Sequence, residues 1–167
     1  MKLTLSIAAV AAILAGGTPR VLVAQDLGIT LGTHAPAATV TTLSGAKANL
    51  SQYVGKGPVL VEFWATWCPN CKELEPTMDR AAAKYGSRVH FVRVAVNVNE
   101  KPGLVKAFVA KYKLPGDHFY DTDGAATDAY DVPATSYVVI LDRAGNVAYT
   151  GLGGKQDLDA AIQKVLR

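Results

Sequence analysis

The hydrophobic positions change their spacing between residues 59 and 98. Residues 59–64 (VLVEFW) form an apolar run with a single acid inside it, which is typical of a central strand buried on both faces. Residues 89–98 alternate and are rich in β-branched side chains, so they predict the next strand. Between these runs, apolar side chains recur at helical spacing over residues 70–85, and Gly86 supplies a stop. The three segments predict a right-handed strand-helix-strand unit with parallel strands.

Shorter patterns flank this unit. Residues 39–50 read as two short alternating runs around a turn, which indicates a β-hairpin. A second amphipathic helix has Pro102 near its start. After an irregular segment, residues 135–154 predict two strands joined by a turn at 143–146, and a last helix closes the chain. This order predicts an α/β domain with a central mixed β-sheet flanked by helices, parallel at first and closed by an antiparallel pair.

The N-terminus carries an export pattern. Residues 1–24 combine one early positive charge, a 13-residue apolar run and small residues beyond it, which predicts a signal peptide cleaved after Ala24 or, as a second choice, after Gly17. The alternative is an uncleaved N-terminal anchor, although the run is shorter than the roughly 20 residues that span a bilayer. Residues 25–38 are rich in Gly, Ala and Pro and predict an extended lead-in, which leaves 39–167 as the folded domain.

Composition and charge narrow the class of protein. The chain has 167 residues, of which 50% are hydrophobic and 19% charged, and this profile fits one globular domain. Lys and Arg exceed Asp and Glu by 17 to 14, but Lys2 and Arg20 lie in the predicted signal peptide, so 15 bases face 14 acids after its removal. This balance gives no indication of a nucleic-acid surface.

The two cysteines, Cys68 and Cys71, lie at the start of the predicted helix. The first turn of a helix exposes unpaired N–H groups and the positive end of the helix dipole, and both favour a thiolate. Such placement lowers a cysteine pKa from about 8.5 to roughly 3.5–7.5. Cys68 is therefore the expected nucleophile, and Cys71 is spaced to attack a mixed disulfide formed there. Pro69 suits the first helical turn, where its missing N–H would be unsatisfied in any case.

Other uses of the cysteine pair fit the sequence less well. Structural zinc needs four ligands, yet there is no second cysteine pair, and His34, His90 and His118 show no ligand spacing. A copper or other metal-delivery protein that uses the pair with a histidine is the main alternative, and an inert pair in a binding module is another. A peroxidase is weaker because the Thr-x-x-Cys setting is missing. We expect a redox-active pair and no further cofactor or metal.

Three acids and one proline lie close to the cysteines in the sequence, and one of the acids bears on proton transfer. Glu62 lies six residues before Cys68 inside the predicted buried strand, so its pKa is expected to be raised and it can exchange a proton with Cys71. The alternative is an edge position or a pair with a lysine such as Lys56 or Lys72. Glu73 and Glu75 are expected to face solvent. Pro76 lies inside the helix and is expected to bend it.

Pro133 precedes the strand predicted after the irregular segment. A cis peptide in a tight turn is plausible there, and an ordinary trans proline at the start of a strand is the alternative. The residues on their own leave both open.

Taken jointly, these motifs resemble a known family. The stretch VLVEFWATWCPNC (59–71), then Pro76, then VPATSYVVILDRAGNV (132–147) resembles the thioredoxin superfamily, and more closely its exported TlpA-like and ResA-like thiol-disulfide oxidoreductases. The lead-in with its extra hairpin is similar to that branch, and the resemblance covers about residues 31–166. It implies a thioredoxin fold with an additional N-terminal β-hairpin.

The resemblance also implies roles for individual residues. Cys68 would attack, Cys71 would resolve, and Pro133 would be the cis-proline beside the disulfide. Val132 would offer backbone groups to an extended substrate strand, with Trp67 and Pro69 shaping the docking surface.

The chain departs from that branch at one position. Many members carry an acid three residues after the second cysteine, where this chain has Leu74, and this departure favours Glu62 as the acid-base group.

The resemblance implies partners that include apocytochromes c, copper-site assembly proteins and other exported thiol proteins, among which nothing in this chain chooses, with electrons from a membrane-bound thiol donor. We therefore expect a periplasmic protein-disulfide reductase that contacts the membrane only if residues 1–24 are retained. Redox direction depends on the potential of the pair relative to its partners, and the reverse direction would make the protein an oxidase.

Overall fold

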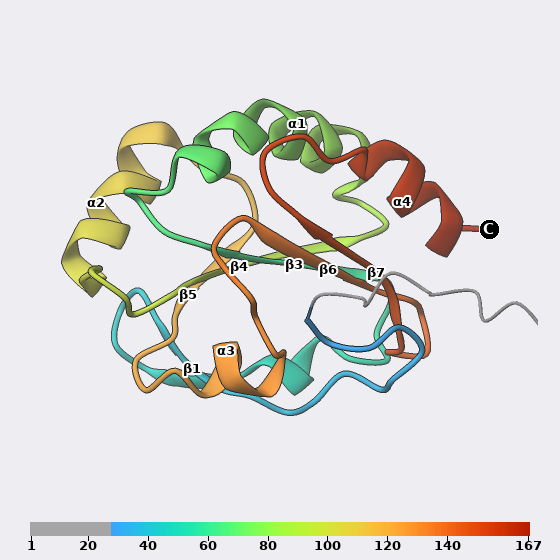
Figure 1. The fold of residues 1–167 in the computed structure, drawn as a ribbon, viewed down its shortest axis with the longest axis horizontal. Helices are drawn as coiled ribbons and strands as arrows, with labels where there is room; N and C mark the ends of the chain where they lie inside the picture. The colour runs from blue at the N-terminus through green and yellow to red at the C-terminus, as the bar shows by residue number, and fades with distance from the viewer. Residues whose placement is uncertain (1–27) are drawn as a thin grey trace, which may run out of the picture.

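The computed structural model describes residues 28–167; the predicted signal peptide and the first residues of the lead-in lie outside the described residues. Seven strands form one sheet in the order β2-β1-β5-β4-β3-β6-β7. In Figure 1, helices α1 and α4 lie together along one face of the sheet and α3 lies on the other. Within residues 28–167, no helix is long and apolar enough to span a membrane.

The predicted strand-helix-strand unit is confirmed. Strand β3 (Val59–Trp64) pairs in parallel with β4 (His90–Ala95), and helix α1 (Pro69–Tyr85) connects them. Every residue of β3 is buried, as the continuous apolar run predicts. Helix α1 ends at Gly86, whose backbone N–H donates to the carbonyl of Ala82. The junction between β3 and α1 carries both cysteines, so this unit positions the site.

The other predicted elements also form. Strands β1 (Thr39–Thr42) and β2 (Lys47–Asn49) make the antiparallel hairpin, followed by a 3₁₀ turn. Strand β6 pairs antiparallel with both β3 and β7, which gives the predicted antiparallel closure. The bounds of the remaining predicted elements are α2 Pro102–Tyr112, β6 Tyr137–Leu141, β7 Val147–Leu152 and α4 Leu158–Val165.

The segment expected to be irregular contains two further elements. Strand β5 (Asp117–Tyr120) pairs in parallel with β4 and antiparallel with β1, and helix α3 (Ala125–Ala129) follows it. Only Phe119 and Tyr120 of β5 are buried, and four residues are too few to show a period. Strand β5 is what joins the N-terminal hairpin to the sheet, so this attachment depends on pairing between distant segments.

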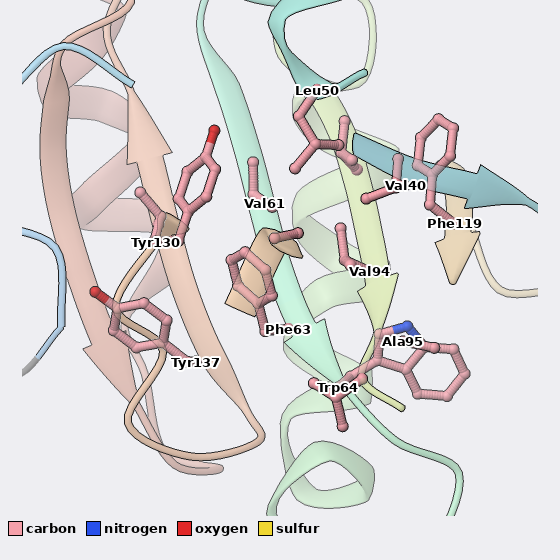
Figure 2. Packing of buried hydrophobic residues seen from close by; sticks show 14 of the residues in the cluster. Val40, Leu50, Val61, Phe63, Trp64, Val94, Ala95, Phe119, Tyr130 and Tyr137 are labelled. Carbon is pink, nitrogen blue, oxygen red and sulfur yellow. The ribbon is translucent and has the colours of Figure 1, made fainter. Parts of the chain in front are cut away.

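The core lies on both faces of the sheet, and β3 contributes to each. Leu60 packs in the cluster beneath α1 and α4, whereas Val61 and Phe63 face the opposite side. Figure 2 shows Phe63 beside two tyrosine rings, Tyr130 and Tyr137, with centroid separations of 5.4 Å and 6.3 Å. This alternation places Glu62 on the same side of the sheet as Leu60, towards α1.

Candidate active site

The turn between β3 and α1 places the cysteine pair at a helix N-terminus. Cys68 is the N-cap of α1 with extended backbone angles, and Pro69 is the first helical residue. Cys68 and Cys71 form a disulfide with their Cα atoms 5.3 Å apart. The local pattern of a buried strand, a tight turn and a proline-led helix therefore produces the geometry of a short redox loop.

Backbone groups favour negative charge at Cys68. The N–H of Cys71 donates to Sγ of Cys68 over 3.0 Å, in addition to the positive field at the helix N-terminus. Burial does not separate the two cysteines, because Cys68 is 2% exposed and Cys71 is 3% exposed. The distinction between an attacking and a resolving sulfur rests on the capping geometry of Cys68.

A buried cluster of charges lies under the start of α1. Arg93 of β4 is fully buried, and its Nε lies 2.7 Å from Oε2 of Glu62, which is also fully buried. This contact is an ion pair whose alignment falls short of a well-formed hydrogen bond. The other two guanidinium nitrogens donate to both carboxylate oxygens of Glu75 over 2.7 Å and 2.6 Å. One arginine therefore joins an acid on β3 to an acid on α1.

The pairing of Glu62 differs from the alternatives considered from the sequence. Its partner is Arg93, and not Lys56 or Lys72, because Glu62 and Arg93 are directly opposite each other in the parallel register of β3 and β4. Burial raises the pKa of Glu62 above its ordinary value; the attraction of Arg93 opposes this, and the nearby charge of Glu75 adds to it.

The expectation that Glu75 faces solvent is wrong. Its side chain is largely buried and is held by Arg93, whereas Glu73 is exposed as expected. A helical pattern marks Glu75 as one turn beyond Cys71, on the face of α1 directed towards the sheet. The sequence did contain one signal for this contact. Arg93 is a base in the middle of an apolar strand, and a buried base requires an acid nearby.

Leu74 explains why the acid that reaches Arg93 is residue 75 and not residue 74. This side chain is fully buried in the cluster with Leu60 and Met78 between the sheet and α1. An acid there would enter an apolar core, whereas an acid one residue later reaches Arg93.

A cavity of about 280 Å³ opens beside Cys71. Cys71, Glu75 and Asp79 follow one another at four-residue spacing, so they share one face of α1. Burial and the charge of Glu75 raise the pKa of Asp79. The complete lining is Trp64, Ala65, Cys71, Lys72, Glu75, Asp79, Phe108, Tyr112 and Leu114. The lining is mainly apolar, but it includes the carboxylates of Glu75 and Asp79 and the space is large enough for water, so it offers a path for protons between Cys71 and solvent.

A second hollow lies beside Trp67, the residue that precedes Cys68. Three of the residues expected to bind substrate, Trp67, Val132 and Pro133, line a groove of about 570 Å³, while Pro69 is not part of it. The indole N–H of Trp67 donates to the carbonyl of Val98 over 3.0 Å, and the ring is 43% exposed. The full lining is Trp67, Val96, Val98, Thr127, Asp128, Asp131, Val132, Pro133, Ala134 and Thr135.

The expectation for Pro133 needs two corrections. Its peptide bond is trans, as are all others in the part of the chain that the structure describes. Pro133 also lies four residues before β6, and the residue directly ahead of that strand is Ser136. Ser136 is buried, and its N–H donates to the carbonyl of Phe63 over 2.9 Å, which places it at the end of β3 that leads to the cysteines.

Ser136 has a left-handed backbone conformation, with φ at 64°, which is uncommon for a residue with a side chain. Three further bonds hold it there: its hydroxyl donates to the carbonyl of Gly153, and its own carbonyl accepts from the Gly153 N–H and the Gln156 amide. Sequence patterns did not single out Ser136, since nothing local marks this conformation.

The described residues contain no group of three or more His, Cys, Asp or Glu side chains arranged to hold a metal ion. His118, for example, lies on β5, where its Nε2 is 3.0 Å from the carbonyl oxygen of Leu114.

Comparison with known proteins agrees with this geometry. The Redoxin family matches residues 30–166. The chain is 35% identical over 141 residues to the thioredoxin-like protein YneN of Bacillus subtilis, covering 83% of this chain and 82% of YneN. It is 30% identical over 143 residues to the thiol-disulfide oxidoreductase ResA of Geobacillus kaustophilus, covering 84% and 81%.

The fold comparison leads to the same group. The crystal structure of a secreted Mycobacterium tuberculosis disulfide oxidoreductase, described as homologous to E. coli DsbE, superimposes with a TM-score of 0.65 at 30% identity. The match covers 77% of this chain and 93% of that one. With the cysteine pair at the N-terminus of α1 and a family match over nearly the whole described chain, this protein belongs to the Redoxin family and is a ResA-like member of the thioredoxin superfamily.

Proposed function

We propose that this protein reduces disulfides in exported partner proteins. The chain is a thiol-disulfide oxidoreductase, as are its named relatives, and it carries the required dithiol-disulfide pair. The observation that carries the proposal is the hydrogen bond from the Cys71 N–H to Sγ of Cys68 at the first turn of α1. This bond stabilises the thiolate that must attack.

The proposed reaction has two exchange steps. The Cys68 thiolate attacks one sulfur of a partner disulfide, so a Cys68-partner bond forms, the partner's own S–S bond breaks, and its other sulfur leaves as a thiolate. Cys71 then gives up its proton and attacks Sγ of Cys68, which releases the second partner sulfur. Two electrons pass to the partner, its thiolates take up protons, and the Cys68-Cys71 disulfide forms.

Glu62 is proposed as the acid-base group for Cys71. Its raised pKa supports this role, because such a carboxyl group holds a proton closer to neutral pH. Glu62 is not among the residues that line the Cys71 cavity, so its route to the sulfur runs past Arg93 and Glu75. Glu75 and Asp79 line the cavity itself and extend the route to solvent.

The partner is proposed to dock at the surface formed by Trp67, Pro69, Val132 and Pro133. We place the protein outside the cytoplasm, in the periplasm if the host has one, with the disulfide reset by a membrane-bound thiol donor. The support is the export pattern of residues 1–24 and the secreted relative described above. Cytochrome c maturation and metal-site assembly are the processes that the resemblance favours for its partners.

The reduction potential of the Cys68-Cys71 pair tests the direction of the reaction. A value close to that of thioredoxin, about −270 mV, would support a reductase, whereas a value near −120 mV, about that of DsbA, would contradict it. The pKa of Cys68, followed by thiolate absorbance in the Cys71→Ser variant, tests the nucleophile. A value above the ordinary 8.5 or so would contradict its assignment.

Metal delivery is the alternative function, and metal analysis separates the two. The reduced protein would be loaded with copper or zinc, desalted and measured. Tight stoichiometric metal would favour delivery, whereas disulfide reduction by protein without metal favours the oxidoreductase.

A further inference from the structure

The groove beside Trp67 has an uneven charge. Asp128 and Asp131 both line it, and none of its lining residues is Lys, Arg or His. The Cys71 cavity, by contrast, has a base in its lining, Lys72, together with the acids Glu75 and Asp79. The groove is therefore the hollow near the cysteine pair whose charged lining residues are all negative.

The rest of the groove has the character of a contact surface. Trp67 is 43% exposed and Val98 is 58% exposed, so a large aromatic and a large aliphatic side chain remain in contact with solvent. The hydrogen bond from Trp67 to the Val98 carbonyl fixes the indole, so a partner would meet it with little loss of side-chain entropy. Rigid aromatic groups on exposed apolar surface are typical anchors of protein contacts.

The position of the groove connects it to the chemistry. Neither cysteine lines the groove, but Trp67 immediately precedes Cys68, so a segment lying against the indole is one residue away from the attacking sulfur. Asp128 belongs to α3, and Asp131 follows that helix in a left-handed conformation with φ at 47°. Both acids are exposed and belong to a segment fixed to the sheet through Asp121, whose buried carboxylate accepts from the N–H groups of Ala126 and Thr127.

We propose that the groove lined by Trp67, Val98, Asp128 and Asp131 selects partner proteins in which the disulfide lies in an extended segment rich in Lys or Arg. This inference rests on the proposed function and adds a substrate class to it. Opposite charges on the groove and the segment speed their encounter and orient the segment across the disulfide, with its basic residues over α3 and away from Lys72.

Two peptides provide the test. They share one cysteine and one sequence, except that lysines flank the cysteine in the first and glutamates in the second, and each cysteine is joined to 2-thiopyridine as a neutral disulfide. Attack by the reduced protein on the peptide sulfur releases pyridine-2-thione, whose absorbance gives the second-order rate constant. Resolution by Cys71 then frees the peptide thiol. The uncharged disulfide 2,2′-dithiodipyridine serves as a reference for the redox chemistry alone.

We expect the lysine peptide to react about tenfold faster than the glutamate peptide at low ionic strength. Salt should reduce this ratio, because both acids are exposed. In the double variant Asp128→Asn, Asp131→Asn the ratio should fall to within about twofold, since the charge that steers the encounter is gone. Asparagine tolerates a left-handed backbone, so Asp131→Asn should preserve the loop. Asp123→Asn removes one charge from the same segment at an exposed residue outside the groove, and should leave the ratio close to that of the unmodified protein.

The outcomes separate the two proposals. If the protein reduces dithiodipyridine but treats the peptides equally or prefers glutamate, the basic-partner inference is wrong and the oxidoreductase proposal stands. A lysine preference that survives in the double variant would overturn the assignment of the groove. If the reduced protein fails to react even with dithiodipyridine, the proposed function fails, and the inference fails with it.

Discussion

Two hollows lie near the cysteine pair, and they differ in what surrounds them. The Cys71 cavity lies between α1 and α2 and adjoins the buried ion cluster of Glu62, Arg93 and Glu75. The Trp67 groove is formed by loops around α3 and the end of β4, and exposes apolar and acidic side chains. In the proposed mechanism the cavity moves a proton to and from a sulfur, and the groove holds a partner. The proposed proton transfer and the proposed partner binding therefore take place in two different hollows.

The cysteines themselves offer the strongest test of this division. In Cys71→Ser we expect a stable mixed disulfide between Cys68 and a partner, and in Cys68→Ser we expect disulfide reduction to fall by at least about a thousandfold, because the activated nucleophile is absent. Trapping of partner disulfides followed by mass spectrometry checks the first, and insulin reduction checks the second. A partner trapped on Cys71 in Cys68→Ser would show that partners enter through the cavity and would reverse the comparison.

The buried charges beside the Cys71 cavity should contribute to the free energy of unfolding far more than an exposed charge does. Arg93→Met leaves Glu62 and Glu75 buried without their base, so the free energy of unfolding should fall by about 3–5 kcal/mol. Urea denaturation measures the change. Arg80→Met is the matched control, because Arg80 is exposed on α1 and bonds only to the hydroxyl of Thr77. A loss no larger than that of the control would mean that the cluster is not stabilising.

Removing a cavity acid should slow the second step of the reaction and spare the first. In Glu75→Gln the release of partner from Cys68 should slow by about tenfold below the pKa of Cys71, while formation of the mixed disulfide keeps its rate. Stopped-flow fluorescence separates the two phases. Glu73→Gln is the control, since Glu73 is exposed, lies about half a helical turn around α1 from Glu75 and outside the cavity lining, and is 3.9 Å from Lys155. Equal slowing of both phases would indicate a structural defect.

Glu62 should make the free energy of unfolding depend on pH, and this effect should be smaller than those described above. Its pKa is raised in the folded protein, so the folded state keeps a proton at pH values where the unfolded chain has lost it. The free energy of unfolding should therefore fall as pH rises from the unfolded pKa through the folded one, by at most about 1.4 kcal/mol per pH unit. Urea denaturation from pH 4 to 8 should show this fall in the unmodified protein and not in Glu62→Gln. Parallel curves would contradict it.

Local patterns were sufficient for much of the fold. The apolar run of β3, the helical spacing of α1 and the turn before β7 each reflect the backbone geometry of one segment, and these elements form as predicted. Strand β5 and helix α3 escaped prediction because four and five residues are too short to show a period. Both become ordered through neighbours, β5 by pairing with β4 and β1.

The site divides in the same way. Cys68 and Cys71 could be assigned from their spacing and from the helix start that follows. Glu75 could not, because its exposure depends on Arg93, which reaches α1 only after β4 has paired with β3. Local patterns could not identify Ser136 as the residue directly ahead of β6, since it takes its left-handed conformation from bonds to distant residues.

The sequence by itself determined a redox-competent cysteine pair at the start of a helix, because strand, turn and helix cap are properties of neighbouring residues. Only the tertiary structure decided what surrounds that pair. It directed Glu62 and Glu75 to a single buried arginine and brought Asp128 and Asp131 beside Trp67. The physical reason is that the charge and burial of a side chain depend on residues distant in sequence, and these meet only when the sheet has formed.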